Sequence, residues 1–244
     1  MLGLPDGVTA CLFDMDGVIT QTAKVHDAAW KEMFDEFLRD WSASHNQPFV
    51  PFDPVRDYDE YVDGKPRLEG TSSFLKSRGI ELPTGSQDDP PGTQTLWGLG
   101  NKKNELVQHV IERDGVQPYE GSVRYVEAVR AAGLRTAIVS SSANTVAVLK
   151  AAGVESLFEA RVDHQVAEER KLHGKPAPDT FLEAARMLGA EPAHAVVFED
   201  ALAGVEAGRA GNFGFVVGVD RVGQAEQLRE HGADVVVKDL SELL

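Results

Sequence analysis

TACLFDMDGV, residues 9–18, is the stretch that decides the fold. Its apolar run, residues 10–13, ends at two carboxylates, Asp14 and Asp16, followed by Gly17. This is how a buried strand of a parallel sheet ends at a turn, and open α/β sheets bind their ligands at that end of their strands. Side chains two positions apart on extended backbone point the same way, so both aspartates are expected to share one site.

The same residues have simpler interpretations that have to be weighed. An Asp-Gly pair after a strand is ordinary turn chemistry. A calcium loop of the EF-hand type is excluded, because it needs glycine at its sixth position, whereas Gly17 is at the fourth. Two carboxylates so arranged suit a metal-assisted attack by one and proton transfer by the other. The rest of the chain must decide between a turn and a catalytic site.

Composition limits the class of protein. The chain has 244 residues, 42% of them hydrophobic and 26% charged, enough for one large domain or a core with a smaller insertion. A net charge of −15 argues against a nucleic acid or an anionic membrane as partner, because no surplus of cations exists to neutralise phosphates. The single cysteine, Cys11, lies in the first predicted strand, so no disulfide is expected. Without a basic leader or a long apolar segment, we expect a cytoplasmic protein. We also expect a monomer.

From Gly115 onward, helical patterns alternate with short apolar strands, which is typical of βαβ units and a parallel sheet. The predicted strands are residues 10–13, 134–139, 160–162, 195–198, 213–219 and 233–237, and the helices between the later ones are residues 122–132, 145–152, 178–188, 201–210 and 224–231. One strand is not stable alone, so residues 10–13 must join the same sheet. We therefore predict an α/β fold with a doubly wound, mostly parallel, Rossmann-like sheet. Gly204, Gly208 and Gly211 are expected to let a helix pack closely on it.

An insertion follows the first strand. Amphipathic spacing predicts a long helix over residues 24–41, short helices over 57–62 and 71–77, and a helix over 102–114, whereas residues 83–100 read as a loop. The prediction is therefore a helical cap, residues 22–112, on an α/β core made of residues 1–21 and 113–244.

Polar residues follow several of the predicted strands. They are Asp14 and Asp16, Ser140, and Glu199 and Asp200, with Lys175 just before helix 178–188. The carboxyl ends of parallel strands meet at one edge of a sheet, so these side chains are expected to lie together. Four carboxylates repel one another unless a divalent cation lies among them, and oxygen ligands favour Mg²⁺. Separately, helix caps and loops would explain each residue, but jointly they favour a catalytic site in which Ser140 and Lys175 would serve a phosphoryl group.

Together these motifs resemble the haloacid dehalogenase superfamily of phosphotransferases. Residues 14–19 are similar to its first motif, Ser140 to its second, Lys175 to its third, and Glu199 and Asp200 to its fourth. The resemblance implies that Asp14 is the nucleophile that forms an aspartyl phosphate and that Asp16 is the general acid and base. It also implies Mg²⁺ held by Asp14, the main-chain oxygen of Asp16, Glu199 and Asp200.

Within that superfamily the cap resembles the β-phosphoglucomutases. Thr22 and His26, four residues apart, match a pair in which the histidine helps to steer the acid/base aspartate. Arg67 is similar to an arginine that grips the substrate's non-reacting phosphate, and Lys103 to a cap lysine. A histidine satisfied within the core, and ordinary surface cations, are the alternatives.

A mutase needs a second phosphate site and a lid that excludes water, whereas a hydrolase holds one phosphate and admits water. Ser142 and Asn144 are expected to complete the second site. Ala143 stands where these mutases commonly have lysine, and residues 83–97 are longer than in their caps.

The resemblance implies conversion of the small molecule β-glucose 1-phosphate to glucose 6-phosphate through glucose 1,6-bisphosphate, with Mg²⁺ as cofactor. A sugar-phosphate phosphatase on the same scaffold is one alternative. A non-catalytic phosphoacceptor is a second, although it would need neither Asp16 nor a cap.

Overall fold

The computed structural model describes residues 2–244, which divide into two compact units. Unit 1 consists of Met1–Thr22 and Val116–Leu244, and unit 2 is Ala23–Gly115.

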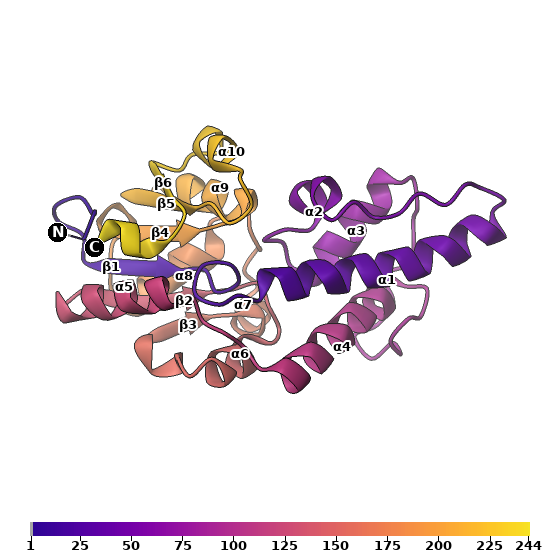
Figure 1. Cartoon of the computed structure of the whole chain (residues 1–244), viewed down its shortest axis with the longest axis horizontal. Helices are drawn as coiled ribbons and strands as arrows, with labels where there is room; N and C mark the ends of the chain where they lie inside the picture. Colours follow the sequence, from indigo (N-terminus) through magenta and orange to yellow (C-terminus); the bar gives the residue numbers. More distant parts are fainter. Residues whose placement is uncertain (1) are drawn as a thin grey trace. The chain divides into compact units, whose positions relative to one another are not determined.

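Unit 1 is built on a parallel sheet whose strands run in the order β3-β2-β1-β4-β5-β6 (Figure 1). The strands are β1 (Ala10–Phe13), β2 (Arg135–Val139), β3 (Ala160–Val162), β4 (Ala195–Glu199), β5 (Phe215–Val219) and β6 (Val235–Val237). The N-terminal strand lies in the middle, with Ala10 opposite Arg135 on one side and Ala195 on the other. The predicted α/β class with a parallel sheet is therefore confirmed.

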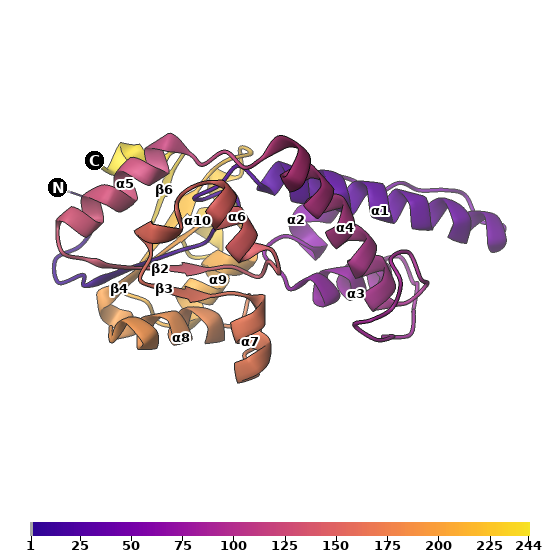
Figure 2. The ribbon, with the colours of Figure 1, turned by 90° about the horizontal axis from the view of Figure 1, so that it is seen from below.

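Helices cover both faces of this sheet, and Figure 2 shows α5 and α8 on opposite sides of it. The helices of unit 1 are α5 (Glu120–Ala131), α6 (Thr145–Ala151), α7 (His164–Arg170), α8 (Asp179–Leu188), α9 (Leu202–Ala210) and α10 (Ala225–Glu230). Leu12 belongs to the apolar cluster that includes Phe181 of α8. Its neighbour Phe13 stacks on Phe198 with ring centres 4.4 Å apart, on the side where Tyr125 of α5 packs. Alternate residues of one strand are thus buried under different helices. Burying each of these side chains contributes roughly 1.5–3 kcal/mol to stability.

One helix of unit 1 does not have a strong enough sequence pattern to be predicted. Helix α7 begins after Asp163, whose carboxylate accepts a hydrogen bond from the main-chain N–H of Val166 at 3.1 Å. With only two turns and a mostly polar sequence, it combines this cap with the packing of one partly buried side chain, Val166, against the core.

Unit 2 is helical, with α1 (Ala23–Ser44), α2 (Arg56–Tyr61), α3 (Arg67–Ser77) and α4 (Leu96–Asp114). Its core is an aromatic cluster in which the rings of Phe34 and Phe74 lie 4.2 Å apart and those of Trp30 and Phe34 lie 5.2 Å apart. Stacked and tilted rings of this kind add about 0.5–1.5 kcal/mol per pair beyond burial. Within residues 2–244, no helix has the length and hydropathy of a membrane span.

The prediction of a loop over residues 83–100 is wrong at its C-terminal end, because α4 already begins at Leu96. The hydroxyl of Thr95 caps this helix by accepting a hydrogen bond from the N–H of Gly98 at 2.9 Å. The two glycines of the first turns look like helix breakers in the sequence. In the structure, a Cβ at Gly98 would lie 2.3 Å from the carbonyl oxygen of Thr93, so this glycine allows a close approach of two chain segments.

Candidate active site

Four charged side chains meet at the carboxyl edge of the sheet of unit 1. Asp14 follows β1 and continues the ladder, since its N–H donates to the carbonyl of Phe198 at 2.9 Å. Lys175, from the loop before α8, forms ion pairs with both Asp14 and Glu199 and reaches the carbonyl of Val139 at 3.3 Å. One carboxylate oxygen from each of Asp14, Glu199 and Asp200 lies within 4.8 Å of the other two. Residues that are far apart in the sequence are thus brought to one point.

Burial controls the charges in this cluster. It raises the pKa of Asp14 well above its usual range, an effect that Lys175 opposes and that Glu199 and Asp16 reinforce. Burial would lower the pKa of Lys175, but Asp14 and Glu199 outweigh it and raise that pKa above its ordinary value. Lys175 therefore stays cationic, and it holds Asp14 toward its ionised form.

The donor set fits a divalent cation. Asp14, Glu199 and Asp200 carry three carboxylates, and the Lys175 ammonium pairs with two of them. Hard oxygen donors are what Mg²⁺ prefers, and its two charges would offset the remaining negative charge. Among the described residues this is the one group of acidic, histidine or cysteine side chains close enough to hold a metal ion.

Two glycines give the carboxylates room. Gly17 has φ +83°, and a Cβ there would lie 1.7 Å from Oδ2 of Asp200. A Cβ at Gly204 would lie 1.9 Å from Oε1 of Glu199. The expectation that Gly204 lets a helix closely approach the sheet agrees with this contact, because Glu199 is the last residue of β4 and Gly204 lies in α9. Gly208 also serves that packing, since its Cβ would touch strand side chains at 3.1–3.3 Å.

The carboxylate of Asp16 is held by a short chain of hydroxyl groups. Thr22, which is buried, donates a hydrogen bond to Oδ1 of Asp16. The hydroxyl oxygens of Thr20 and Thr22 lie 2.7 Å apart, and Thr20 also donates to the carbonyl of Met15 at 3.2 Å. Thr22 was a predicted site residue, whereas Thr20 was not. Its position two residues before Thr22 on the same turn is the signal that would have found it.

The loop after β2 holds three predicted residues. Ser140 is buried, and its N–H donates to the carbonyl of Val162 at 3.0 Å. Its hydroxyl accepts a hydrogen bond from the N–H of Ser142 at 3.1 Å, and the hydroxyl of Ser142 accepts one from the N–H of Asn144 at 3.1 Å. This ladder of hydroxyls fixes residues 140–144 in place before α6 begins.

The predicted residues of unit 2 form two local contacts. Nζ of Lys103 lies 2.8 Å from Nδ1 of His26 and 4.8 Å from the ring centre of Trp30. Lys103 is only 6% exposed, an unusual burial for lysine that its aromatic and imidazole neighbours make tolerable. Arg67, at the start of α3, places its guanidinium carbon 5.8 Å from the ring centre of Trp97. Both predicted cations of unit 2 thus lie near tryptophan rings.

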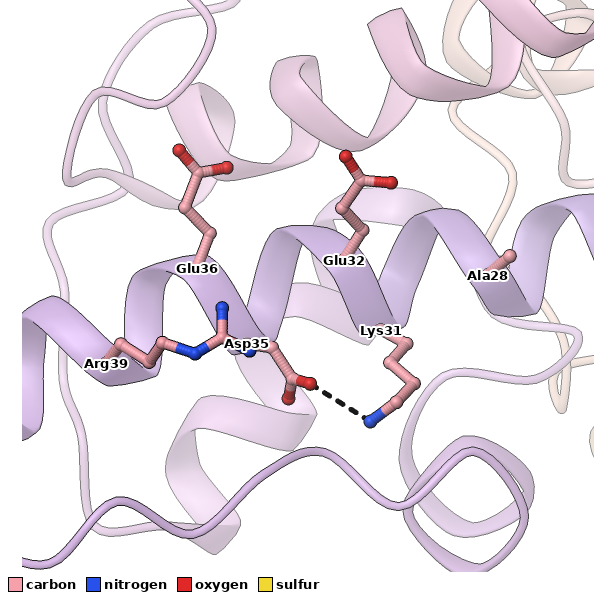
Figure 3. Close-up of a pocket in the computed structure, with 6 residues that line it drawn as sticks. All are labelled: Ala28, Lys31, Glu32, Asp35, Glu36 and Arg39. Carbon is pink, nitrogen blue, oxygen red and sulfur yellow. Dashed lines mark hydrogen bonds and ion pairs between the residues drawn. The ribbon is translucent and has the colours of Figure 1, made fainter.

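A shallow hollow of about 500 Å³ lies along α1 of unit 2, and it contains none of the predicted site residues (Figure 3). The residues that line it are Ala28, Lys31, Glu32, Asp35, Glu36 and Arg39. Lys31 pairs with Asp35 at 3.0 Å, and Asp35 in turn accepts a hydrogen bond from the N–H of Phe52 at 2.8 Å. These charges tie the chain at Phe52 to α1, which is a structural role.

Two residues that the sequence pattern missed contact the site loops. Arg221 donates to the carbonyl of Gly17 at 2.7 Å, and Gln224 donates to the carbonyl of Asp200 at 3.0 Å. Both follow β5 at the carboxyl edge of the sheet. The rule applied to the other strands, that polar residues just after a strand reach the site, would have found them.

Comparisons with known proteins agree with this geometry. The model of a family described as a haloacid dehalogenase-like hydrolase matches residues 8–212. A Mycobacterium bovis protein named Beta-phosphoglucomutase is 56% identical over 247 residues, covering 100% of this chain and 94% of that protein. A Bacillus subtilis protein of the same name is 32% identical over 234 residues, covering 96% and 91%. A crystal structure of a hydrolase from Pseudomonas syringae has the same fold, with a TM-score of 0.75 at 22% identity over 96% of this chain and 95% of that one.

Proposed function

Since the chain belongs to the haloacid dehalogenase-like hydrolase family, we propose that it is a magnesium-dependent β-phosphoglucomutase. It would convert β-glucose 1-phosphate to glucose 6-phosphate through glucose 1,6-bisphosphate. The likeness to the Mycobacterium bovis protein along the whole chain carries this proposal. The cluster of Asp14, Lys175, Glu199 and Asp200 supports it, because phosphoryl transfer needs a nucleophile set among compensating charges.

Asp14 is the proposed nucleophile. Its carboxylate would attack the phosphorus atom, the bond from phosphorus to the sugar oxygen would break, and an aspartyl phosphate would remain. Lys175 supports this step by pairing with Asp14 and opposing the rise that burial causes in the pKa of that carboxyl. Bound Mg²⁺, held by Asp14, the main-chain oxygen of Asp16, Glu199 and Asp200, would supply positive charge against the phosphoryl oxygens.

Asp16 is the proposed general acid and base. It would give a proton to the departing sugar oxygen and take one from the hydroxyl that attacks next. The bond from Thr22 fixes the orientation of this carboxylate. Ser140 is proposed to donate its hydroxyl proton to a phosphoryl oxygen.

The residues proposed to hold the non-reacting phosphate are Arg67, Ser142 and Asn144. His26 and Lys103 are proposed to act with them, His26 on the orientation of Asp16. What supports these roles is the resemblance of their sequence positions, together with the contact of His26 and Lys103 within unit 2. The cytoplasmic location and the monomeric state stay predictions.

A sugar-phosphate phosphatase is the second candidate, because the matching family model is described as a hydrolase. Both activities would use the same Asp14 chemistry and differ only in whether water or a sugar hydroxyl accepts the phosphoryl group. A non-catalytic phosphoacceptor is set aside, since the named relatives that cover most of the chain are enzymes.

The deciding experiment supplies β-glucose 1-phosphate, Mg²⁺ and a trace of glucose 1,6-bisphosphate, and measures glucose 6-phosphate and free phosphate together. We expect glucose 6-phosphate to form with little free phosphate, and formation to stop when a chelator removes Mg²⁺. The α anomer of glucose 1-phosphate is the matched control for the substrate. Release of one phosphate per sugar would reject the mutase and favour the phosphatase.

A further inference from the structure

The loop between β5 and α10, residues 220–224, is folded rigidly on itself. The carboxylate of Asp220 accepts hydrogen bonds from the N–H of Gly223 at 2.6 Å and of Gln224 at 2.8 Å. The N–H of Asp220 donates to the carbonyl of Val237, which ties the loop to β6. Two long side chains, Arg221 and Gln224, are therefore anchored on a fixed base.

Arg221 donates hydrogen bonds to main-chain carbonyl oxygens, two of them in the turn that follows Asp16. Nε donates to Gly17 at 2.7 Å and Nη2 to Val18 at 3.4 Å, while Nη1 donates to Lys238 at 2.7 Å. Its guanidinium carbon also lies 3.5 Å from the ring centre of Tyr119. A guanidinium is always charged and planar, so its donors address several fixed acceptors at once, which an ammonium on a flexible stem does not do.

Gln224 holds the other side of the site. Its side chain is buried, and Nε2 donates to the main-chain carbonyl of Asp200 at 3.0 Å. The two segments held by this loop touch each other, because the position a Cβ would take at Gly17 lies 1.7 Å from Oδ2 of Asp200. One loop thus fixes the main chain on both sides of the contact between the first and the fourth strand ends.

We propose that Arg221 and Gln224 are positioning residues for phosphoryl transfer. By holding the carbonyls of Gly17 and Val18 on one side and of Asp200 on the other, they set the spacing of the Asp16 turn and the Asp200 carboxylate. This spacing matters because displacing a reacting group by about 1 Å costs roughly 100-fold in rate. The inference rests on the proposed function only in assigning Asp16 and Asp200 to the reaction.

The test compares R221Q and R221K with R209Q. Arg209 also donates to a carbonyl, that of Gly232, and pairs with Asp234 at 2.8 Å, so R209Q removes similar contacts that involve no site residue. The measurements are kcat and KM, the melting temperature, and the Mg²⁺ dissociation constant of the substrate-free protein by titration calorimetry. For R221Q we expect kcat to fall roughly 10- to 100-fold with KM nearly unchanged, and Mg²⁺ binding to weaken about tenfold. R221K should recover part of both losses.

R209Q should keep wild-type kcat and Mg²⁺ affinity at whatever melting temperature it shows. If R221Q and R209Q differ from the wild type only in melting temperature, Arg221 is merely structural and the inference is overturned. Q224M removes one hydrogen bond at similar volume, and it provides the test if R221Q fails to fold. Its Mg²⁺ affinity should fall about three- to tenfold, and unchanged affinity counts against the inference.

These readouts separate the two proposals. Mg²⁺ binding and turnover of p-nitrophenyl phosphate do not depend on which sugar phosphate is the substrate. A wild-type protein that makes no glucose 6-phosphate but binds Mg²⁺ and hydrolyses p-nitrophenyl phosphate would reject the mutase and leave the role of Arg221 fully testable.

Discussion

The two units of the molecule hold their cations in different surroundings. In unit 1, Lys175 is 1% exposed and lies between the carboxylates of Asp14 and Glu199. In unit 2, Lys103 lies over the ring of Trp30, and Arg67 lies over the ring of Trp97. A carboxylate pairs with a cation through its charge, whereas an indole ring attracts it through the negative face of its π system. Lys175 is thus packed among the acidic side chains of the candidate site, and the two cations of unit 2 have aromatic rings beside them.

The largest expected effect tests whether the chemistry belongs to unit 1. Asp14→Asn keeps the shape of the side chain but removes the nucleophile, so we expect phosphoryl transfer to fall by at least about 10⁴-fold. The circular dichroism spectrum should be unchanged. Asp163→Asn is the matched control, because Asp163 is also buried after a strand and its helix-capping role suits asparagine. Near-normal activity in Asp14→Asn would refute the assignment of the nucleophile.

A second variant measures how strongly the balanced charges of unit 1 depend on each other. Lys175→Met leaves Asp14 and Glu199 buried side by side, and we expect the free energy of unfolding to fall by about 3–5 kcal/mol in magnesium-free buffer. Lys31→Met is the control, since that side chain is 40% exposed in its pair with Asp35. This substitution should lower the free energy of unfolding by about 1 kcal/mol or less. Urea unfolding of both variants gives the comparison. Equal losses would mean that burial does not distinguish the two ion pairs.

A third variant tests the role of unit 2. Arg67→Ala should lower kcat/KM for β-glucose 1-phosphate roughly 10- to 100-fold, the value of one or two hydrogen bonds to a charged group. Turnover of p-nitrophenyl phosphate should hardly change, because this substrate has no second phosphate group for Arg67 to bind. Arg56→Ala removes a 74% exposed arginine of the same unit and should affect neither substrate. If Arg67→Ala slows both substrates equally, the second-phosphate role is wrong.

The smallest expected effect is a pH dependence confined to unit 2. Partial burial, with help from Asp27 and Asp53, raises the pKa of Asp59 to about 6. The carboxyl group of Asp59 therefore keeps its proton to higher pH in the folded chain than in the unfolded chain, where an aspartate has a pKa of about 3.9. The contribution of Asp59 to stability is complete below about pH 4 and is lost as pH rises through about 6. The free energy of unfolding should fall by about 1 kcal/mol or less over this range.

Asp59→Asn should reduce this slope in thermal melts recorded between about pH 4 and pH 7, and the rest of the slope comes from other carboxyls with raised pKa values, such as Asp14 and Asp27. The pKa of Asp53 itself is lowered, because main-chain N–H groups of residues 55 and 56 bond its carboxylate, so its own contribution to stability is lost only below about pH 4. Its charge helps to raise the pKa of Asp59, so Asp53→Asn should weaken the same slope. An unchanged slope in Asp59→Asn would contradict the assignment.

Much of unit 1 was predictable from the sequence because its strands are short apolar runs with polar residues just beyond them. The meeting of Asp14, Lys175, Glu199 and Asp200 follows from that pattern once the strands are known to be parallel. The same pattern does not predict which carboxylate needs a glycine beside it. The contact of Gly204 with Glu199 depends on how closely α9 approaches β4, and local sequence does not encode that distance.

The prediction failed where tertiary contacts outweigh local preference. Gly98 and Gly100 suggested a loop, but close packing against Thr93 and Arg67 makes glycine the fitting residue there. Helix α7 has too few apolar residues for a visible period and depends on the carboxylate of Asp163. Arg221 carries no motif of its own, and only its place after β5 connects it to the site.

The central place of β1 in the sheet has a consequence for biosynthesis. This strand leaves the ribosome before the rest of the sheet, yet its two partners are β2 and β4, and β4 ends only at Glu199. Unit 2 is continuous in sequence and is complete much earlier, so it can fold while β1 still waits for its neighbours. A nascent chain arrested before residue 195 would carry an unpaired apolar edge, and it is at this stage of translation that a chaperone would be needed most.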